Sequence, residues 1–333
     1  MKVAILGGGL SGLVSAQAFK DSAQVTIIEP GRPGGTFAAG GFKYFHATEA
    51  MQSLCDNLSL QWCEVPIKGG ILLDGSVRPY PDHLRQLPEP QALDIMRAHF
   101  DKTRGDGEFT KTAMNDPWGH KPDKLITDVN KFIEACMRGV DWMKASARSL
   151  VTPNRVETTN GSLDFDLLVN TLPLWIFGRM MPKDAHGETP DLMHKIATAI
   201  KAATTRVTVL KCLTASNRLA GYDYVYTPFT KSDVIHRVSL SQSWYDCETT
   251  KSMDHQLADV FSDLESIFGE QPHVIGGVTL NGHVKRIEWL KSWMGKLPEQ
   301  WLHVGRFAQW DGRCTVDKAY SHALELARRH IRG

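Results

Sequence analysis

The chain has 333 residues, of which 42% are hydrophobic and 23% are charged, and its formal net charge at pH 7 is +1. This composition is that of an ordinary globular chain, and the balanced charge does not indicate nucleic acid or an anionic membrane as a partner. No run approaches about 18 consecutive apolar residues and the N-terminus itself reads as a strand, so we expect no transmembrane helix, no signal peptide and a cytoplasmic location.

The beginning of the chain holds its most informative pattern. Residues 3–6 predict a strand, residues 13–19 predict a helix, and Gly7, Gly9 and Gly12 lie between them in Gly-x-Gly-x-x-Gly spacing. The first glycine permits a tight turn out of the strand, the second lets a pyrophosphate approach the backbone, and the third lets the helix pack closely on the sheet. The helix N-terminus then offers free N–H groups and a positive dipole end to phosphates.

A second apolar run, residues 25–28, predicts another strand, and it ends in Glu29. A carboxylate at this point would accept hydrogen bonds from the 2′-hydroxyl of a ribose. The first strand, the glycines, the helix, the second strand and the acid all fall in the order that such a site needs. The sequence therefore predicts a dinucleotide site.

The next segments combine glycine-rich loops with short regular elements. Residues 31–36 and 39–46 are rich in glycine, which indicates close backbone approach or bends with positive φ. Residues 48–58 carry an apolar stripe that predicts a helix. The Asp-Gly pair inside residues 71–78 lies between apolar runs and predicts a hairpin.

From residue 91 to about residue 143 the pattern is mostly helical, and it then returns to strands. The run 166–171 is almost entirely apolar, as a buried parallel strand should be. Later runs rich in β-branched and aromatic residues predict a second sheet. The elements expected are strands at 155–159 and 166–171, strands at 205–212, 222–227 and 234–242, a helix at 255–268, a strand with a glycine turn at 301–307 and a helix at about 316–330.

The order strand, glycine turn, helix thus appears at both ends of the chain. This repetition predicts an α/β fold in which both ends build one Rossmann-like nucleotide domain and the middle is inserted as an α+β substrate domain. We expect the nucleotide domain over residues 1–80, 135–175 and 295–333, and the second domain over residues 81–134 and 176–294.

The cysteines show no C-x-x-C spacing and no accompanying cluster of histidines. We therefore expect reduced thiols rather than disulfides or metal ligands, and we expect no metal site. The six cysteines are Cys55, Cys63, Cys136, Cys212, Cys247 and Cys314.

Several motifs together resemble one family of proteins. They are the glycine pattern with Glu29, the pair Gly34-Gly35, Tyr-Phe-His-Ala-Thr at 44–48, Asp-Pro-Trp-Gly at 116–119 with Pro122, Tyr226 followed by His-Arg-Val at 236–238, and Gly-Arg-Phe-Ala-Gln-Trp at 305–310. This set resembles the flavin-binding superfamily that contains UDP-galactopyranose mutases, protoporphyrinogen oxidases and flavin amine oxidases. The resemblance implies FAD as the cofactor and makes the expected nucleotide domain an FAD-binding domain.

The resemblance also implies site residues. The expected cofactor-binding residues are Gly7, Gly9, Leu10, Ser11, Gly12, Glu29, Pro30, Arg32, Gly34, Gly35, Thr36, Val140, Thr171, Gly305, Arg306 and Trp310. His46 and Arg237 are the expected catalytic residues, since an imidazole beside the flavin can relay a proton and a guanidinium can grip an anion. The aromatic candidates for the substrate cavity are Trp118, Tyr224, Tyr226 and Trp244.

Several of these residues could instead have a purely structural role. His46 could be a loop histidine bonded to backbone, Arg237 an exposed strand residue and Arg306 a surface ion pair. Trp310 and the other large aromatic residues could equally belong to the hydrophobic core.

One departure from the mutase pattern bears on the reaction. After the closing Gly-Arg, mutases usually carry an aromatic residue followed by a basic residue and a tyrosine, but this chain has Trp310, Asp311 and Gly312. The tyrosine that helps to hold a diphosphate is missing, which favours an amine-oxidase-like oxidoreductase that takes a hydride from a C–H next to nitrogen or oxygen. The alternatives are a mutase-like isomerase that uses reduced flavin N5 as nucleophile, and a flavin-bound protein without turnover. The partner expected is a small-molecule or nucleotide-linked substrate, and no oligomeric state is predicted.

Overall fold

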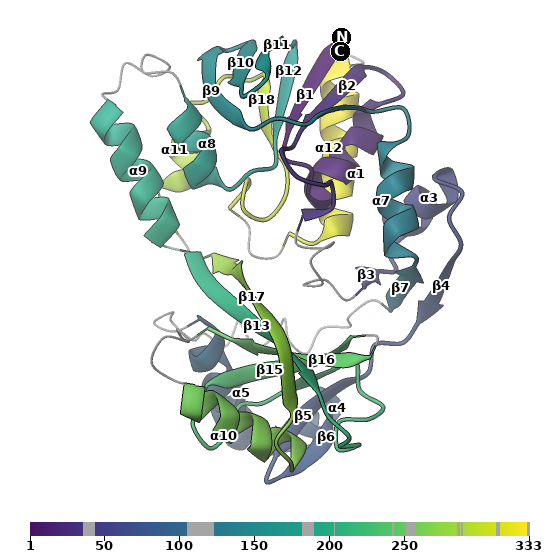
Figure 1. Cartoon of the computed structure of the whole chain (residues 1–333), viewed down its shortest axis with the longest axis vertical. Coiled ribbons are helices and arrows are strands. Elements are labelled where there is room, and N and C mark those ends of the chain that lie inside the picture. Colours follow the sequence, from purple (N-terminus) through teal and green to yellow (C-terminus); the bar gives the residue numbers. More distant parts are fainter. Residues whose placement is uncertain are drawn as a thin grey trace. The chain divides into compact units, whose positions relative to one another are not determined.

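The computed structural model describes residues 1–35, 44–104, 123–181, 190–202, 204–241, 243–250, 257–284, 287, 289–310 and 314–331. The chain divides into two compact units (Figure 1). Unit 1 comprises Met1–Val65, Asp123–Ala203 and Arg286–Gly333, and unit 2 comprises Pro66–Pro122 and Thr204–Lys285. Both ends of the chain and a central stretch therefore build unit 1, and the two stretches between them build unit 2.

A five-stranded parallel sheet in the order β18-β12-β1-β2-β8 forms the centre of unit 1. Its strands are β1 (Lys2–Leu6), β2 (Gln24–Ile28), β8 (Asp141–Met143), β12 (Leu167–Asn170) and β18 (Trp301–His303). Strand β12 is buried at every position, as its apolar run predicts. The strands expected at 3–6, 25–28 and 166–171 are confirmed.

Helices cover both faces of this sheet because the side chains of each strand alternate between two cores. Val3 and Ile5 belong to one core, together with residues of α1 (Leu10–Phe19), α3 (Glu49–Asn57), α7 (Val129–Met137) and α12 (Val316–Ile331). Ala4 and Leu6 belong to the other, together with residues of α8 (Leu174–Met180), α9 (Pro190–Ala202) and α11 (Leu290–Met294). The parallel sheet with helices on both faces is the Rossmann-like α/β arrangement.

Two small antiparallel sheets complete unit 1. One contains β9 (Ala147–Thr152), β10 (Arg155–Thr158) and β11 (Gly161–Asp164), and the other contains β3 (Phe45–His46), β7 (Lys124–Thr127) and β4 (Trp62–Val65). The largely helical prediction for residues 91–143 is wrong at β7 and β8. Both strands are too short to show a period, and each is held by pairing with a partner that is distant in the sequence.

Unit 2 is built on a mixed seven-stranded sheet in the order β17-β13-β16-β15-β14-β5-β6. Its strands are β5 (Gly69–Leu73), β6 (Ser76–Tyr80), β13 (Thr204–Leu213), β14 (Tyr224–Tyr226), β15 (Ile235–Ser241), β16 (Trp244–Thr249) and β17 (His273–Val284). Helix α10 (Leu257–Phe268) packs on one face. Leu84 of α4 (Asp82–Arg85) and Met96 of α5 (Glu89–Arg104) pack on the other.

The boundaries of the two units differ from those expected from the sequence. The hairpin β5–β6 has its predicted Asp-Gly turn, but it belongs to unit 2 because β5 pairs in parallel with β14. Conversely, unit 1 contains helices that the sequence assigned wholly or partly to the second domain, namely α7, α8, α9 and α11. None of the described helices is long and apolar enough to cross a membrane.

Candidate functional site

The loop that follows β1 is a closed turn whose glycines are required by close contacts. Gly7 has a φ of +98° and its N–H donates to the carbonyl of Ile28 at 3.0 Å. The hydroxyl of Thr171 donates to the carbonyl of Leu6 at 2.7 Å and ties the loop to β12. A Cβ on Gly12 would overlap the carbonyl oxygen of Gly7. The first and third glycines therefore serve the turn and the approach of the helix, as predicted.

The second glycine has a different setting, because it lies at the open N-terminus of α1. Gly9 is the N-cap of the helix with a φ of −68°, and no described side chain caps it. The first turn carries no acidic residue. A Cβ on Gly9 would have no heavy atom within 4 Å among the residues described. No described side chain therefore caps the first N–H groups of the helix, and uncapped N–H groups at a helix N-terminus are suited to binding phosphate groups.

The carboxylate of Glu29 is held beside this loop. It accepts hydrogen bonds from the N–H groups of Gly8 at 2.9 Å and Gly31 at 3.0 Å. These two bonds fix the acid at the carboxyl end of β2, next to the glycine turn. Pro30 and Arg32 follow it at exposed positions, and half-buried Val140 lies just before β8, the strand that pairs with β2.

The second pair of glycines contacts the first set directly. The N–H of Gly34 donates to the carbonyl of Gly8 at 2.7 Å, and Gly34 forms a parallel bridge with Gly9. A Cβ on Gly35 would lie 3.1 Å from Cα of Gly9. The two glycine segments therefore lie backbone to backbone. Thr36, also expected at the cofactor, lies outside the described residues.

The closing segment reaches the same place from the other end of the chain. Gly305 has a φ of +97°, and a Cβ there would overlap the side chain of Ser11 in α1. Arg306 follows at a half-buried position. Trp310 packs edge-on against Trp175, with ring centroids 6.3 Å apart. The start and the end of the chain thus meet at the N-terminus of α1.

Gly305→Ala should lower the free energy of unfolding by about 2–4 kcal/mol, because it adds both backbone strain and overlap with Ser11. Gly161→Ala is the matched control: Gly161 has a φ of +107° but no described heavy atom within 4 Å of its Cβ position. The control should cost only about 1–2 kcal/mol from backbone strain. Urea denaturation of both variants measures the difference, and equal losses would show that the Ser11 contact is absent.

The stability of unit 1 should depend on pH through His303, which precedes the closing segment. Burial lowers the pKa of His303 from 6.5 to about 4, and its Nδ1 lies 3.1 Å from Nδ2 of Asn170. A lowered histidine pKa means that the unfolded chain binds the proton first, so stability falls as the pH drops from 6.5 to 4. The loss should be about 3 kcal/mol. Unfolding titrations of the wild type and of His303→Gln should diverge over this pH range, and parallel curves would contradict the assignment.

His46 lies against the first turn of α12. Its Nδ1 is 3.6 Å from Oδ1 of Asp317, and the two side chains are 28% and 12% exposed. Strand β3 holds the histidine by pairing with Leu125 and Lys124 of β7. The Asp317 carboxylate can orient the imidazole. Asp317, which is not among the site residues expected from the sequence, therefore supplies a side chain next to His46.

In unit 2, Arg237 pairs with a buried acid that the sequence analysis did not identify. A bulge in β15 places both His236 and Arg237 opposite Glu248 of β16. Nη2 of Arg237 lies 2.6 Å from Oε1 of Glu248, and Nε2 of His236 lies 3.6 Å from Oε2. Burial acts to raise the pKa of Glu248, but Arg237 and His236 outweigh it and hold the pKa well below its usual range. Burial also lowers the pKa of His236, although Glu248 opposes the shift.

Of the aromatic candidates, Tyr226 lies beside Arg237 in the sheet. Tyr226 pairs with Arg237 in the strand register, and its ring centroid is 4.2 Å from that of His99 and 5.0 Å from those of Tyr80 and Tyr224. Burial raises the pKa of Tyr80 far above its usual range.

Trp244 differs from the tyrosines in its polar partners. Its indole N–H donates to Asp246 at 2.9 Å, and the Lys211 ammonium lies 5.1 Å from its ring centroid. Trp118 lies outside the described residues. The described part of the chain contains no group of three or more His, Cys, Asp or Glu side chains that could hold a metal ion.

These features define unit 1 as a Rossmann-like α/β unit with an uncapped helix N-terminus, a carboxylate fixed at the end of β2 and a closing segment from the far end of the chain. No protein-family model matches the sequence, and no curated protein matches it either.

Solved structures match the chain over nearly its whole length. The fold is similar to that of a reduced UDP-galactopyranose mutase, with a TM-score of 0.72 at 14% identity, covering 98% of this chain and 93% of that chain. It is similar to that of a redesigned putrescine oxidase, with a TM-score of 0.69 at 13% identity, covering 100% and 99%. It is also similar to that of a protein reported as a protoporphyrinogen oxidase from Exiguobacterium, with a TM-score of 0.63 at 14% identity and 98% of both chains covered. The expected resemblance to this group of folds is confirmed.

Proposed function

We propose that the protein is an FAD-dependent enzyme, with oxidation of an amine-like small molecule as its reaction. The main support for FAD as the cofactor is the uncapped N-terminus of α1. No described heavy atom lies within 4 Å of the Cβ position of Gly9 there, and hydrogen bonds fix Glu29 beside it. A dinucleotide supplies what this arrangement lacks, namely phosphate oxygens for the helix N–H groups and ribose hydroxyls for the carboxylate.

Each part of unit 1 has a separate role in holding FAD. The backbone N–H groups at the start of α1 would bind the pyrophosphate, and Glu29 would bind the ribose of the adenosine half. Val140 would offer its backbone to the adenine. Gly305 and Arg306, carried by the closing segment, would hold the flavin half.

The flavin supplies the redox chemistry, because its oxidised ring accepts a hydride from a C–H next to nitrogen or oxygen. The protein's own residues would then bind and orient the substrate and hold or transfer protons. His46 would hold or pass a proton, and Asp317 at 3.6 Å would keep its imidazole oriented.

The setting of Arg237 favours an amine-like substrate over a diphosphate. The guanidinium is paired with the buried carboxylate of Glu248 at 2.6 Å, so the pair carries no net charge. A diphosphate clamp needs uncompensated cations, and this neutral pair does not supply one. The tyrosine that mutases place after the closing Gly-Arg is also absent, since Asp311 and Gly312 follow Trp310.

A sugar-nucleotide mutase is the second candidate, favoured by the TM-score of 0.72 to a reduced UDP-galactopyranose mutase. Under this alternative, Arg237 would have to release part of its bond to Glu248 in order to bind a diphosphate. Replacement of Glu248 would then strengthen diphosphate binding, whereas under the oxidase proposal it would not.

Anaerobic spectra of the FAD-loaded protein distinguish the candidates. The oxidase proposal predicts bleaching of the flavin by at least one member of a panel of amines and amino acids. Conversion of UDP-galactofuranose only after reduction with dithionite would support the mutase instead. A protein that holds FAD but responds to neither would be the non-catalytic alternative and would contradict the proposed reaction.

A further inference from the structure

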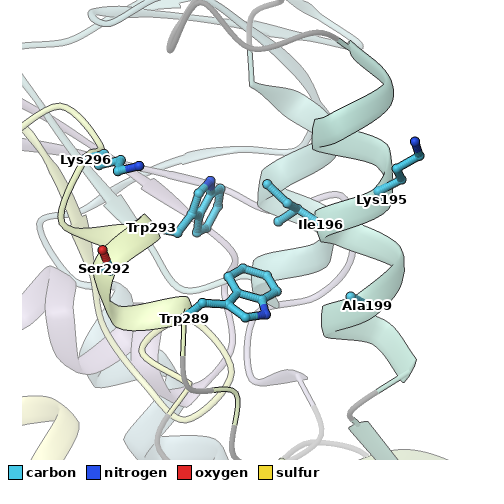
Figure 2. A pocket seen from close by; sticks show the side chains of 7 residues that line it. All are labelled: Lys195, Ile196, Ala199, Trp289, Ser292, Trp293 and Lys296. Atoms are coloured by element: carbon cyan, nitrogen blue, oxygen red, sulfur yellow. The ribbon is translucent and has the colours of Figure 1, made fainter.

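A groove lies on the face of the unit 1 sheet opposite to α1, between α9 and α11 (Figure 2). Its volume is about 460 Å³, which is in the range of small-molecule sites. None of its lining residues belongs to the candidate FAD site. The proposed function therefore leaves this groove without a role.

The groove has one apolar wall and one polar end. Ile196 and Ala199 of α9 face Trp289, whose side chain is 44% exposed. An indole ring left this exposed beside aliphatic side chains offers a flat surface on which another ring can pack. The apolar wall thus suits an aromatic body.

The polar end contains a buried donor that lacks an acceptor. Trp293 is only 6% exposed, and its indole nitrogen has no hydrogen-bond partner among the residues described. Buried indole N–H groups normally find an acceptor. Figure 2 shows the Lys296 ammonium directed toward the nitrogen-bearing edge of Trp293. Since Lys296 is exposed and flexible, it can move aside and expose the N–H to a bound group.

We propose that this groove is a second binding site, and that it takes a small aromatic carboxylate. The aromatic body would pack between Trp289 and Ile196. The carboxylate would accept the indole N–H of Trp293 and pair with the Lys296 ammonium. A carboxylate matches this end of the groove because one positive charge and one neutral donor converge there.

Calorimetric titration of the full chain, saturated with FAD, with 2-naphthoate tests the site. We expect saturable binding of one molecule per chain, and binding of the neutral isostere 2-naphthamide at least about tenfold weaker, the size expected for losing a hydrogen bond to a charged group. Trp293→Phe keeps the ring but removes the donor, and it should weaken 2-naphthoate by about tenfold. It should weaken 2-naphthamide less, because the bond from the indole N–H to a neutral amide oxygen is weaker than the bond to a carboxylate.

Two exposed lysines provide a matched pair that cannot disturb the core. Lys296→Gln should weaken 2-naphthoate several-fold, whereas Lys195→Gln should weaken it less, since Lys195 also lines the groove but its ammonium points away from it in Figure 2. Absence of 2-naphthoate binding would overturn the proposal. The proposal would also be wrong if Trp293→Phe and Lys296→Gln left the affinity for 2-naphthoate unchanged. Tighter binding of decanoate than of 2-naphthoate would contradict it too, because the ligand would then be a fatty acid rather than an aromatic carboxylate.

Discussion

Gly9→Val should abolish FAD binding while leaving the protein folded. Gly9 has a φ of −68°, which valine adopts without strain, and its Cβ would point into space that no described atom fills. The branched side chain would stand over the first N–H groups of α1, where the pyrophosphate must approach. We expect a Kd for FAD at least about 100-fold higher, equivalent to about 3 kcal/mol. Fluorescence titration of the apoprotein with FAD measures it.

Gly276→Val is the matched control for this variant. Gly276 lies in β17 of unit 2, and a Cβ there also meets no described heavy atom within 4 Å. This control should bind FAD with the affinity of the wild type. If Gly9→Val retained normal affinity, or lost FAD only by unfolding, the assignment of the phosphate site to α1 would be wrong.

Arg237→Met should be among the most destabilising single changes in unit 2. It leaves the carboxylate of Glu248 buried without its strongest partner. Breaking a buried ion pair in this way costs about 3 kcal/mol, the low end of the usual range because the Arg237 side chain is itself 39% exposed. Denaturant unfolding at pH 7 measures the loss. Arg85→Met removes an exposed pair with Asp82 and should cost less than about 1 kcal/mol.

The pH dependence of the stability lost in Arg237→Met provides a separate test. In the wild type the pKa of Glu248 is lowered, so its stabilising contribution is fully present above the pKa of the unfolded chain and is lost as the pH falls below that value toward the pKa of the folded state. Without Arg237, burial acts with less opposition and the pKa rises. The penalty of Arg237→Met should therefore shrink as the pH falls from 7 to 5, because protonation removes the unpaired charge. If the loss of stability caused by Arg237→Met stayed constant from pH 7 to pH 5, the unpaired charge of Glu248 would not be its cause.

The sequence predicts the nucleotide unit well because its signals are local. The Gly-x-Gly-x-x-Gly turn, the adjacent apolar runs and Glu29 lie within one short segment, and the structure confirms the strands and the helix there. The order strand, glycine, helix repeats at the far end of the chain and predicts that both ends build one unit. The contact of Gly305 with Ser11 agrees with this prediction.

The parts that the sequence analysis missed depend on tertiary contacts. Strand β16 places Asp246 and Glu248 in a sheet, against their low strand propensity, because Glu248 is paired with Arg237 there. The role of Asp317 is set by His46, a residue far away in the sequence. The sequence does not single out Glu248, because the run Trp-Tyr-Asp-Cys-Glu-Thr at 244–249 contains a second acid, Asp246. Only the strand register brings Glu248 and Arg237 together.

The central claim is that both ends of the chain build one FAD site. Reconstitution of the purified full chain with FAD, followed by gel filtration and measurement of flavin absorbance against protein, tests this most directly. We expect a yellow protein with one FAD per chain. A colourless protein with no retained flavin after reconstitution would contradict it.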